Sequence, residues 1–256
     1  MILKQAVWVS YKCYVLLVFF FTLVPFYPIF IFYLAKEERW EKCFVWQRRW
    51  GKVVRVLTGI RLKIQGRENL PKPPYVIIAN HASYIDTFLM YGVIPDFFVF
   101  MGMASLQKFP MFGRFFSSGQ NIPVDRASHK DSVKAFKIAQ EKLAKGYSVA
   151  LFPEGGIKSQ VPELGSFKNG AFKLAMEAKV PLVPVLMFNT HILLESNDLF
   201  RTSGKPGKAP VHILKPRETS HLKQEDLIPL RENIREVMKN DLQSYYFKKQ
   251  NRKNED

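Results

Sequence analysis

Beyond Arg61 the chain alternates short runs of β-branched and aromatic residues with stretches of helical period, and this alternation constrains the fold more than any other feature. The runs that read as strands, each bounded by Gly, Pro or Asn, are YVIIAN (75–80), FFVFMGM (97–103), NIPVDR (121–126), YSVALFPE (147–154), PLVPVLMF (181–188) and APVHILKP (209–216). The expected helices are 83–94, 131–146, 170–179 and a final one from Gln224 to Tyr246. The alternation predicts an α/β fold with a mixed or mostly parallel sheet flanked by helices.

Two side chains suited to acid–base chemistry follow the first of these strands. His81 comes just after the strand, and Asp86 lies five residues further on. On one straight α-helix a five-residue step turns side chains about 140° apart, so the two residues can meet only across a bend. A strand that ends near Asn80 and a helix that opens near Ser83 bring the carboxylate to the imidazole, as a base and the group that orients it. Glu154 falls at the end of another strand, and ligands of such sheets bind at the carboxyl ends of the strands.

Four short blocks follow one another between Tyr75 and Val185. They read HASYID from His81, NIPVDR ending at Arg126, FPEGG around Glu154, and VPLVP ending at Pro184. Each block by itself has an ordinary explanation as a surface arginine, a turn or a buried strand. In this order, the blocks resemble the motif set of the glycerolipid acyltransferase superfamily, in particular the bacterial 1-acylglycerol-3-phosphate acyltransferases.

This resemblance implies a reaction and a set of site residues. The implied reaction moves a fatty acyl group from acyl carrier protein or coenzyme A to the free hydroxyl of a lysophospholipid, 1-acylglycerol-3-phosphate, and forms phosphatidic acid. Because a thioester is already activated, the chemistry needs a base and positioning, and neither a metal ion nor a cofactor is expected. The resemblance makes His81 the base and Asp86 its orienter. The implied acceptor-binding residues are Arg126, Glu154, Gly155 and Gly156, and Asn80, Lys158 and Pro184 complete the candidate substrate-binding set.

The third block departs from the family pattern. The family often continues F-P-E-G with Thr-Arg-Ser, whereas this chain continues with Gly156, Ile157 and Lys158. Lys158 supplies a positive charge one position on, but it lacks the planar fork of an arginine. The acceptor therefore stays open between lysophosphatidate and another lysolipid, such as a lyso-aminolipid or lysophosphatidylglycerol, and a non-catalytic lipid-binding module is the alternative outside enzymes. Ser83 is the nearby nucleophile for an acyl-serine route, but no G-x-S-x-G elbow surrounds it, so direct transfer is favoured.

An uncharged apolar run, from Tyr14 to Leu34, precedes the strand-rich region. As a helix it is about 30 Å long, which is enough to enter a membrane. Pro25 and Pro28 interrupt the run, and proline inside a helix removes a hydrogen bond, so we expect two helices that meet near these prolines. Basic residues and tryptophans follow Leu34, as is typical of the cytoplasmic side and of the membrane interface. The expectation is an N-terminal hydrophobic two-helix membrane anchor, monotopic and on the cytoplasmic face of the inner membrane. A straight transmembrane span is the alternative for the apolar run. For the basic stretch after Leu34, the alternative is a solvated helix whose Trp and Val residues pack on the core.

The charge of the chain indicates an anionic partner. Lys and Arg number 38 against 22 Asp and Glu, which gives a formal net charge of +16. No RNP-like strand, paired-cysteine finger or recognition-helix pattern is present, so we expect an anionic membrane surface as a partner and no nucleic acid. The expected organisation is a membrane-associated helical segment at 1–58, an acyltransferase domain at 59–247 and a disordered tail at 248–256.

Overall fold

Seven strands within the described residues form one sheet, in the order β1-β7-β6-β2-β5-β3-β4. The computed structural model describes residues 2–108, 111, 113–125, 127–157, 161–195 and 202–254. The strands are β1 Ile60–Gln65, β2 Val76–Ala79, β3 Phe98–Met103, β4 Ile122–Val124, β5 Ser148–Leu151, β6 Leu182–Met187 and β7 Gly207–Ile213. Neighbouring strands are parallel except for the antiparallel pair β6 and β7. The prediction of an α/β fold with a mostly parallel sheet is confirmed.

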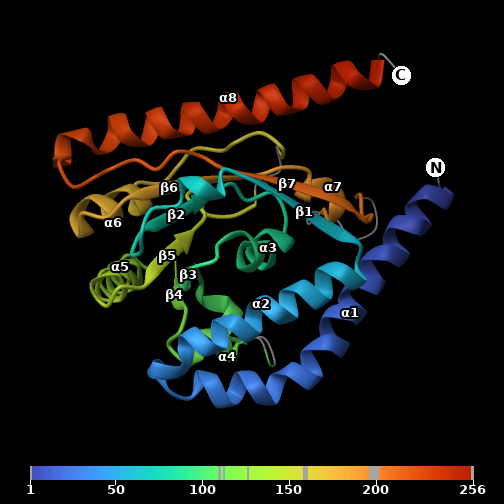
Figure 1. The fold of residues 1–256 in the computed structure, drawn as a ribbon, viewed down its shortest axis with the longest axis horizontal. Helices are drawn as coiled ribbons and strands as arrows, with labels where there is room; N and C mark the ends of the chain where they lie inside the picture. Colours follow the sequence, from blue (N-terminus) through green and yellow to red (C-terminus); the bar gives the residue numbers. More distant parts are fainter. Residues whose placement is uncertain are drawn as a thin grey trace.

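Helices cover both faces of this sheet (Figure 1). One face carries α5 His129–Ala144, α6 Gly170–Ala178 and α8 Leu227–Asn254, and the other carries α2 Trp40–Leu57 and α3 Ile85–Val93. The remaining helices are α1 Ile2–Leu34, α4 Arg114–Ser117, α7 Thr190–Leu193 and the short turns η1 Glu37–Arg39, η2 Arg67–Asn69, η3 Ala104–Lys108 and η4 Gln224–Asp226. In β2, Val76 and Ile78 pack on the side of α5, α6 and α8, whereas Ile77 and Ala79 pack on the side of α2 and α3. Strand β2 is thus buried on both faces. Because it runs parallel to β5 and β6, the loop that follows it emerges at the carboxyl edge of these strands.

The structure adds one strand and lengthens one helix relative to the sequence expectation. All six expected strands are present, and β1 is new; its alternate residues Arg61 and Lys63 are exposed, so its apolar signal is weak. Helix α8 continues past Tyr246 to Asn254, so residues 248–254 are helical where a disordered tail was expected. Within this extension, Lys249 Nζ donates to Asn189 Oδ1 at 2.7 Å.

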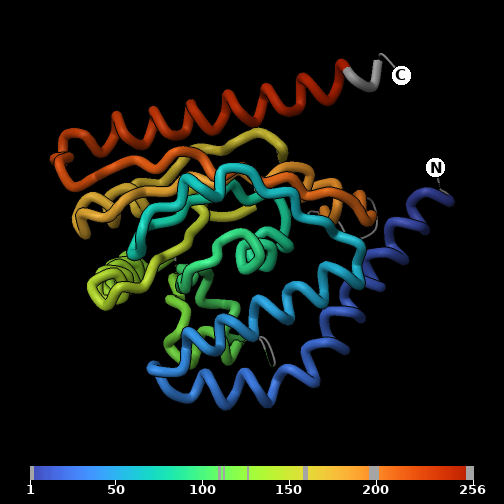
Figure 2. Tube along the Cα trace, viewed as in Figure 1, coloured from blue at the N-terminus to red at the C-terminus, as the bar shows by residue number. Residues whose placement is uncertain are grey.

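Helix α1 is a single helix that contains both Pro25 and Pro28. The expected break at these prolines is therefore wrong, because the helix ends only after Leu34, where a charged run begins and α2 follows. A proline inside a helix removes one hydrogen bond and bends the helix without necessarily ending it. Figure 2 shows α1 as a bent tube. By length and composition, Leu3–Leu34 is long and apolar enough to cross a membrane.

One side of α1 packs against α2 and α4. Leu23 and Phe30 are fully buried there, in one cluster with Trp50 and Phe115. The opposite side is apolar and exposed; the side chain of Phe21, for example, is 73% exposed. Helix α1 therefore attaches to the sheet-bearing part of the protein by one side and presents a hydrophobic side to its surroundings.

Candidate active site

The loop between β2 and α3 brings His81 and Asp86 together. His81 comes two residues after the end of β2, and Asp86 lies in the first turn of α3. His81 Nδ1 is 3.0 Å from Asp86 Oδ2. The Asp86 side chain is fully buried, and the His81 side chain is 14% exposed. The predicted meeting of the two side chains across a strand-to-helix bend is confirmed.

The carboxylate of Asp86 is held in place by the backbone of the same loop. Its Oδ2 atom also accepts hydrogen bonds from the backbone N–H of Ala82 at 2.7 Å and of Ser83 at 2.8 Å. An ionised carboxylate is only an acceptor, so Nδ1 of His81 carries the hydrogen of their shared bond, and Nε2 keeps a free lone pair. The pair has the arrangement of a general base with its orienting carboxylate.

An aromatic ring fixes the plane of the imidazole. Phe152, the first residue after β5, stacks on His81 with ring centroids 4.0 Å apart and an interplanar angle of 10°. Strand β5 runs parallel to β2 with Leu151 opposite Ile78, so the residues that follow the two strands lie side by side. The sequence alone did not indicate a role for Phe152, although this residue opens the FPEGG block. The missing signal was the pairing of β5 with β2, which sequence spacing does not give.

Glu154 supports the backbone of the histidine loop. Its Oε1 accepts from the backbone N–H of His81 at 2.9 Å, and its Oε2 accepts from the N–H of Gly165 at 2.8 Å. The residue is 3% exposed. Burial raises the pKa of Glu154, while the two backbone hydrogen bonds act in the opposite direction. Both oxygens of this carboxylate therefore accept hydrogen bonds from the backbone, one of them from His81.

The two glycines after Glu154 form a tight turn. Gly155 has φ +79° and Gly156 has φ +154°, a range that side-chain-bearing residues rarely adopt. The N–H of Gly155 donates to the carbonyl of Phe152 at 3.1 Å and closes the turn. A Cβ atom on Gly155 would lie 2.9 Å from Cε of Lys168, so the missing side chain leaves room for this lysine. The turn that the sequence singled out therefore lies beside His81.

Of the two candidates Asn80 and Pro184, only Asn80 lies next to His81. The side chain of Asn80 pairs with the backbone of Met187 at the end of β6: Oδ1 accepts from its N–H at 2.7 Å, and Nδ2 donates to its carbonyl at 2.9 Å. Asn80 is 4% exposed, so its amide fixes the end of β2 to β6. Pro184 is buried within β6, opposite Ile78, and lines a hollow beside α8. The structure thus brings Asn80 to the histidine as a support and does not bring Pro184 there.

The remaining candidates are Arg126, Lys158 and Ser83. Arg126 and Lys158 lie outside the described residues. Ser83 is fully buried, and its hydroxyl donates to the carbonyl of Leu194. Because an acyl-serine route needs an accessible hydroxyl, this geometry favours direct transfer over a covalent intermediate.

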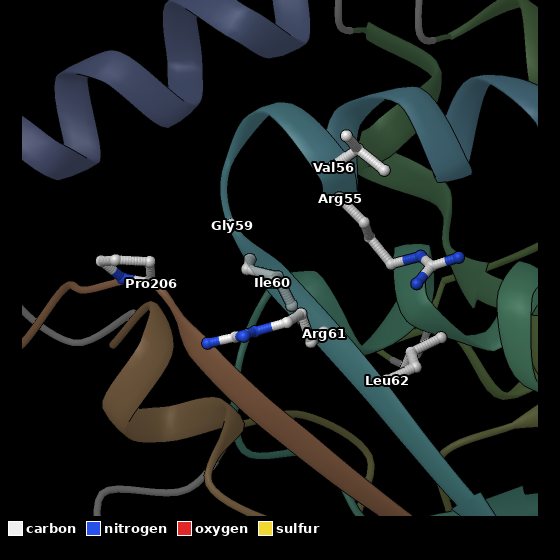
Figure 3. A pocket seen from close by; sticks show the side chains of 7 residues that line it. All are labelled: Arg55, Val56, Gly59, Ile60, Arg61, Leu62 and Pro206. Atoms are coloured by element: carbon white, nitrogen blue, oxygen red, sulfur yellow. The ribbon is translucent and has the colours of Figure 1, made fainter.

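A cavity of about 580 Å³ lies elsewhere, at the junction of α2 and β1 (Figure 3). Arg55 and Arg61 extend from these two elements in different directions, and Pro206 also lines the cavity. Its lining residues include neither His81 nor Asp86. The catalytic candidates therefore do not line this cavity.

A family model and several known proteins match this chain. A family model described as Acyltransferase matches residues 61–188, half of the chain. A 1-acyl-sn-glycerol-3-phosphate acyltransferase of Saccharomyces cerevisiae is 32% identical over 190 residues, which cover 73% of this chain and 61% of that protein. One of Pseudomonas aeruginosa is 31% identical over 166 residues, which cover 64% of this chain and 62% of that protein. The chain spans about three fifths of the length of these curated relatives.

A solved structure has a similar fold. The crystal structure of the 1-acyl-sn-glycerophosphate (LPA) acyltransferase PlsC from Thermotoga maritima superposes with a TM-score of 0.72 at 24% sequence identity. The match covers 92% of this chain and 98% of that chain. The architecture described above is therefore one that an experimental structure also has.

Proposed function

Because this chain belongs to the acyltransferase family, we propose that it transfers a fatty acyl group from a thioester to the free hydroxyl of 1-acylglycerol-3-phosphate, forming phosphatidic acid. The observation that carries this proposal is the His81 and Asp86 pair, 3.0 Å apart at the carboxyl end of β2. A base held by a buried carboxylate is the group that an alcohol needs in order to attack a thioester.

In the proposed reaction, Nε2 of His81 takes the proton of the acceptor hydroxyl as its oxygen attacks the thioester carbonyl carbon. The new C–O bond forms a tetrahedral intermediate, and Asp86 stabilises the imidazolium that results. The intermediate collapses, the C–S bond breaks, and the thiolate leaves with the proton that the imidazolium returns. The steps balance with two substrates and the protein alone.

Three neighbouring side chains contact the base or the segment that carries it. Phe152 fixes the plane of the imidazole, Glu154 holds the backbone N–H of His81, and Asn80 fixes the end of β2. Such support matters because a reacting group displaced by about 1 Å can lose a factor of about 100 in rate. We assign these three residues as positioning residues.

The proposed acceptor follows from the names of the relatives and from the net charge of the chain. The named relatives are acyltransferases of 1-acyl-sn-glycerol-3-phosphate, and a formal net charge of +16 suits a phosphate-bearing lipid and an anionic membrane surface. The acyl donor is a thioester of acyl carrier protein or of coenzyme A, and it is assigned by offering both to the purified protein.

We further propose that α1 and α2 form a monotopic anchor on the cytoplasmic face of the inner membrane. The exposed hydrophobic side of α1 and the tryptophan-rich, basic helix α2 support this placement. A Leu3→Cys protein in a Cys13→Ser background tests it with a membrane-impermeant thiol reagent. Protection in intact cells with labelling after lysis agrees with the anchor, and labelling from outside intact cells would indicate a true span.

The catalytic proposal is tested by His81→Ala, with His212→Ala as a matched control. His212 also forms a 3.0 Å pair with an aspartate, Asp241, but on β7 and α8. Purified wild type and both variants are given lysophosphatidate with labelled acyl-CoA or acyl carrier protein. We expect loss of transfer for His81→Ala and near wild-type transfer for His212→Ala. Normal turnover by a folded His81→Ala protein would rule out the mechanism.

A further inference from the structure

The turn after β5 has a basic neighbour that the sequence analysis did not single out. The side chain of Lys168 crosses Gly155: a Cβ atom placed on that glycine would lie 2.9 Å from Cε and 3.2 Å from Nζ of the lysine. Lys168 is exposed, and within the described part of the chain its ammonium group has no carboxylate partner within salt-bridge distance. The turn therefore carries a positive charge that no carboxylate of the described residues neutralises by an ion pair.

The backbone around Lys168 is fixed to the active-site turn. Its N–H donates to the carbonyl of Pro153 at 2.8 Å. Three residues earlier, Gly165 is held on both sides, since its N–H donates to Glu154 at 2.8 Å and its carbonyl accepts from Nε of Arg235 at 2.9 Å. These backbone bonds fix the point from which the Lys168 side chain extends over the turn.

The same turn contacts the base at two points. Phe152 stacks on the ring of His81, and Glu154 bonds to its backbone, so Lys168 rests on the segment that supports the histidine. In 1-acylglycerol-3-phosphate, one carbon and one ester oxygen separate the hydroxyl-bearing carbon from phosphorus. When the hydroxyl is at His81, the phosphate must therefore lie a few ångströms away. A charge-assisted hydrogen bond is the strongest contact that a single side chain offers to this group.

We propose that Lys168 binds the phosphate of the acceptor and thereby selects a phosphate-bearing lysolipid over a neutral monoacylglycerol. This inference rests on the proposed acyl transfer at His81 and identifies the acceptor-recognising charge of the same site. It also explains the glycine at position 155, because a side chain there would displace the lysine from the turn.

The test compares acceptors with and without phosphate. Lys168→Gln removes the charge at similar length, Lys168→Arg keeps it, and Lys173→Gln removes an exposed charge from α6, where Lys173 pairs with Glu177 at 3.6 Å. Values of kcat and KM are measured in mixed micelles for lysophosphatidate, 1-monoacylglycerol and the acyl donor. In Lys168→Gln we expect the preference for lysophosphatidate, expressed as the ratio of the two kcat/KM values, to fall about 10- to 100-fold. Lys168→Arg should retain most of it, Lys173→Gln should match wild type, and the KM of the donor should not move.

Two results would overturn the inference. An unchanged preference in Lys168→Gln would remove the lysine from acceptor recognition, and an equal loss on both acceptors with a lowered Tm would make its role structural. If wild type acylates neither acceptor, the proposed function fails by itself. In that case Lys168 is tested by ligand-induced stabilisation: the Tm increase caused by lysophosphatidate, minus that caused by monoacylglycerol, is measured for wild type and for Lys168→Gln. If this difference is the same in both proteins, phosphate binding at Lys168 is refuted.

Discussion

Substituting Glu154 by glutamine separates the two roles considered for this carboxylate. The sequence resemblance implied that Glu154 binds the acceptor, whereas its oxygens accept from the N–H groups of His81 at 2.9 Å and Gly165 at 2.8 Å. Glutamine has almost the same shape, but one of its two terminal groups is a donor. Whichever way the amide turns, an NH₂ group must face a backbone N–H, so one of the two hydrogen bonds is lost.

Two opposing terms set the size of the stability effect. A hydrogen bond to a charged group contributes about 1.5–3 kcal/mol, which the variant loses. The variant also no longer buries a charge, and the pKa of Glu154 is raised mainly by burial, so part of this loss is recovered. We expect the two terms to nearly cancel near neutral pH, which leaves a change in stability within about 1 kcal/mol, or about 2–4 °C in Tm for a chain of this size.

The larger effect is expected on catalysis. Without its tether, the backbone of His81 is less fixed, and a loss of about 1.4–2.8 kcal/mol in the transition state corresponds to a 10- to 100-fold lower kcat. The KM values for acceptor and donor should stay within about a factor of two, because Glu154 touches neither substrate in this assignment. A selective rise in the KM of lysophosphatidate with unchanged kcat would refute the positioning role and restore the acceptor-binding one.

The pH dependence of stability gives a second readout of the same substitution. Because burial raises the pKa of Glu154 above its ordinary value of 4.5, ionisation costs the folded state free energy. The stability that this carboxyl contributes is therefore full below about pH 4.5 and falls as pH rises through the raised folded-state pKa. Glutamine does not titrate, so the Tm difference, wild type minus variant, should decrease from pH 4.5 upward. A difference that grows with pH would mean that the folded state favours the ionised carboxylate.

Two further substitutions test neighbouring groups. Asp86→Asn should lower kcat by about three orders of magnitude, because the amide cannot hold the required tautomer of His81; steady-state kinetics checks this, and activity within tenfold of wild type would contradict the orienting role. Ser83→Ala should keep transfer within a few-fold, with about 1 kcal/mol lower stability from the lost bond to Leu194. Loss of more than about 100-fold at an unchanged Tm would instead favour an acyl-serine intermediate.

The sequence by itself determined the local features of this protein. Strand and helix periods predicted six of the seven described strands, and the mostly parallel sheet followed from their alternation with helices. The pairing of His81 with Asp86 was also predictable, because the two residues are five positions apart and one strand-to-helix bend is enough to join them. The order of the four blocks predicted the family, which the match of residues 61–188 to the acyltransferase family model confirms.

The observed structure differs from the sequence expectation at two places. At each of them a local sequence signal is outweighed by contacts with a distant part of the chain. Pro25 and Pro28 are strong helix-breaking signals, yet α1 continues through both because its buried side packs continuously on α2 and α4. Strand β1 has exposed basic residues at alternate positions and becomes a strand by pairing with β7, 147 residues later in the chain. In both cases tertiary packing outweighs a local preference.

Only the tertiary structure decided which residues surround the base. Strand order places β5 and β6 on either side of β2, and this arrangement brings Glu154 and Met187 to the loop that carries His81. No spacing in the sequence states that order, because parallel neighbours are joined through helices of variable length and their register is set by the packing of both faces. The same holds for Lys168, which reaches Gly155 only because its loop folds back over the turn after β5. Contacts within one bend are fixed by the chain itself, whereas contacts between strands far apart in sequence exist only once the sheet has assembled.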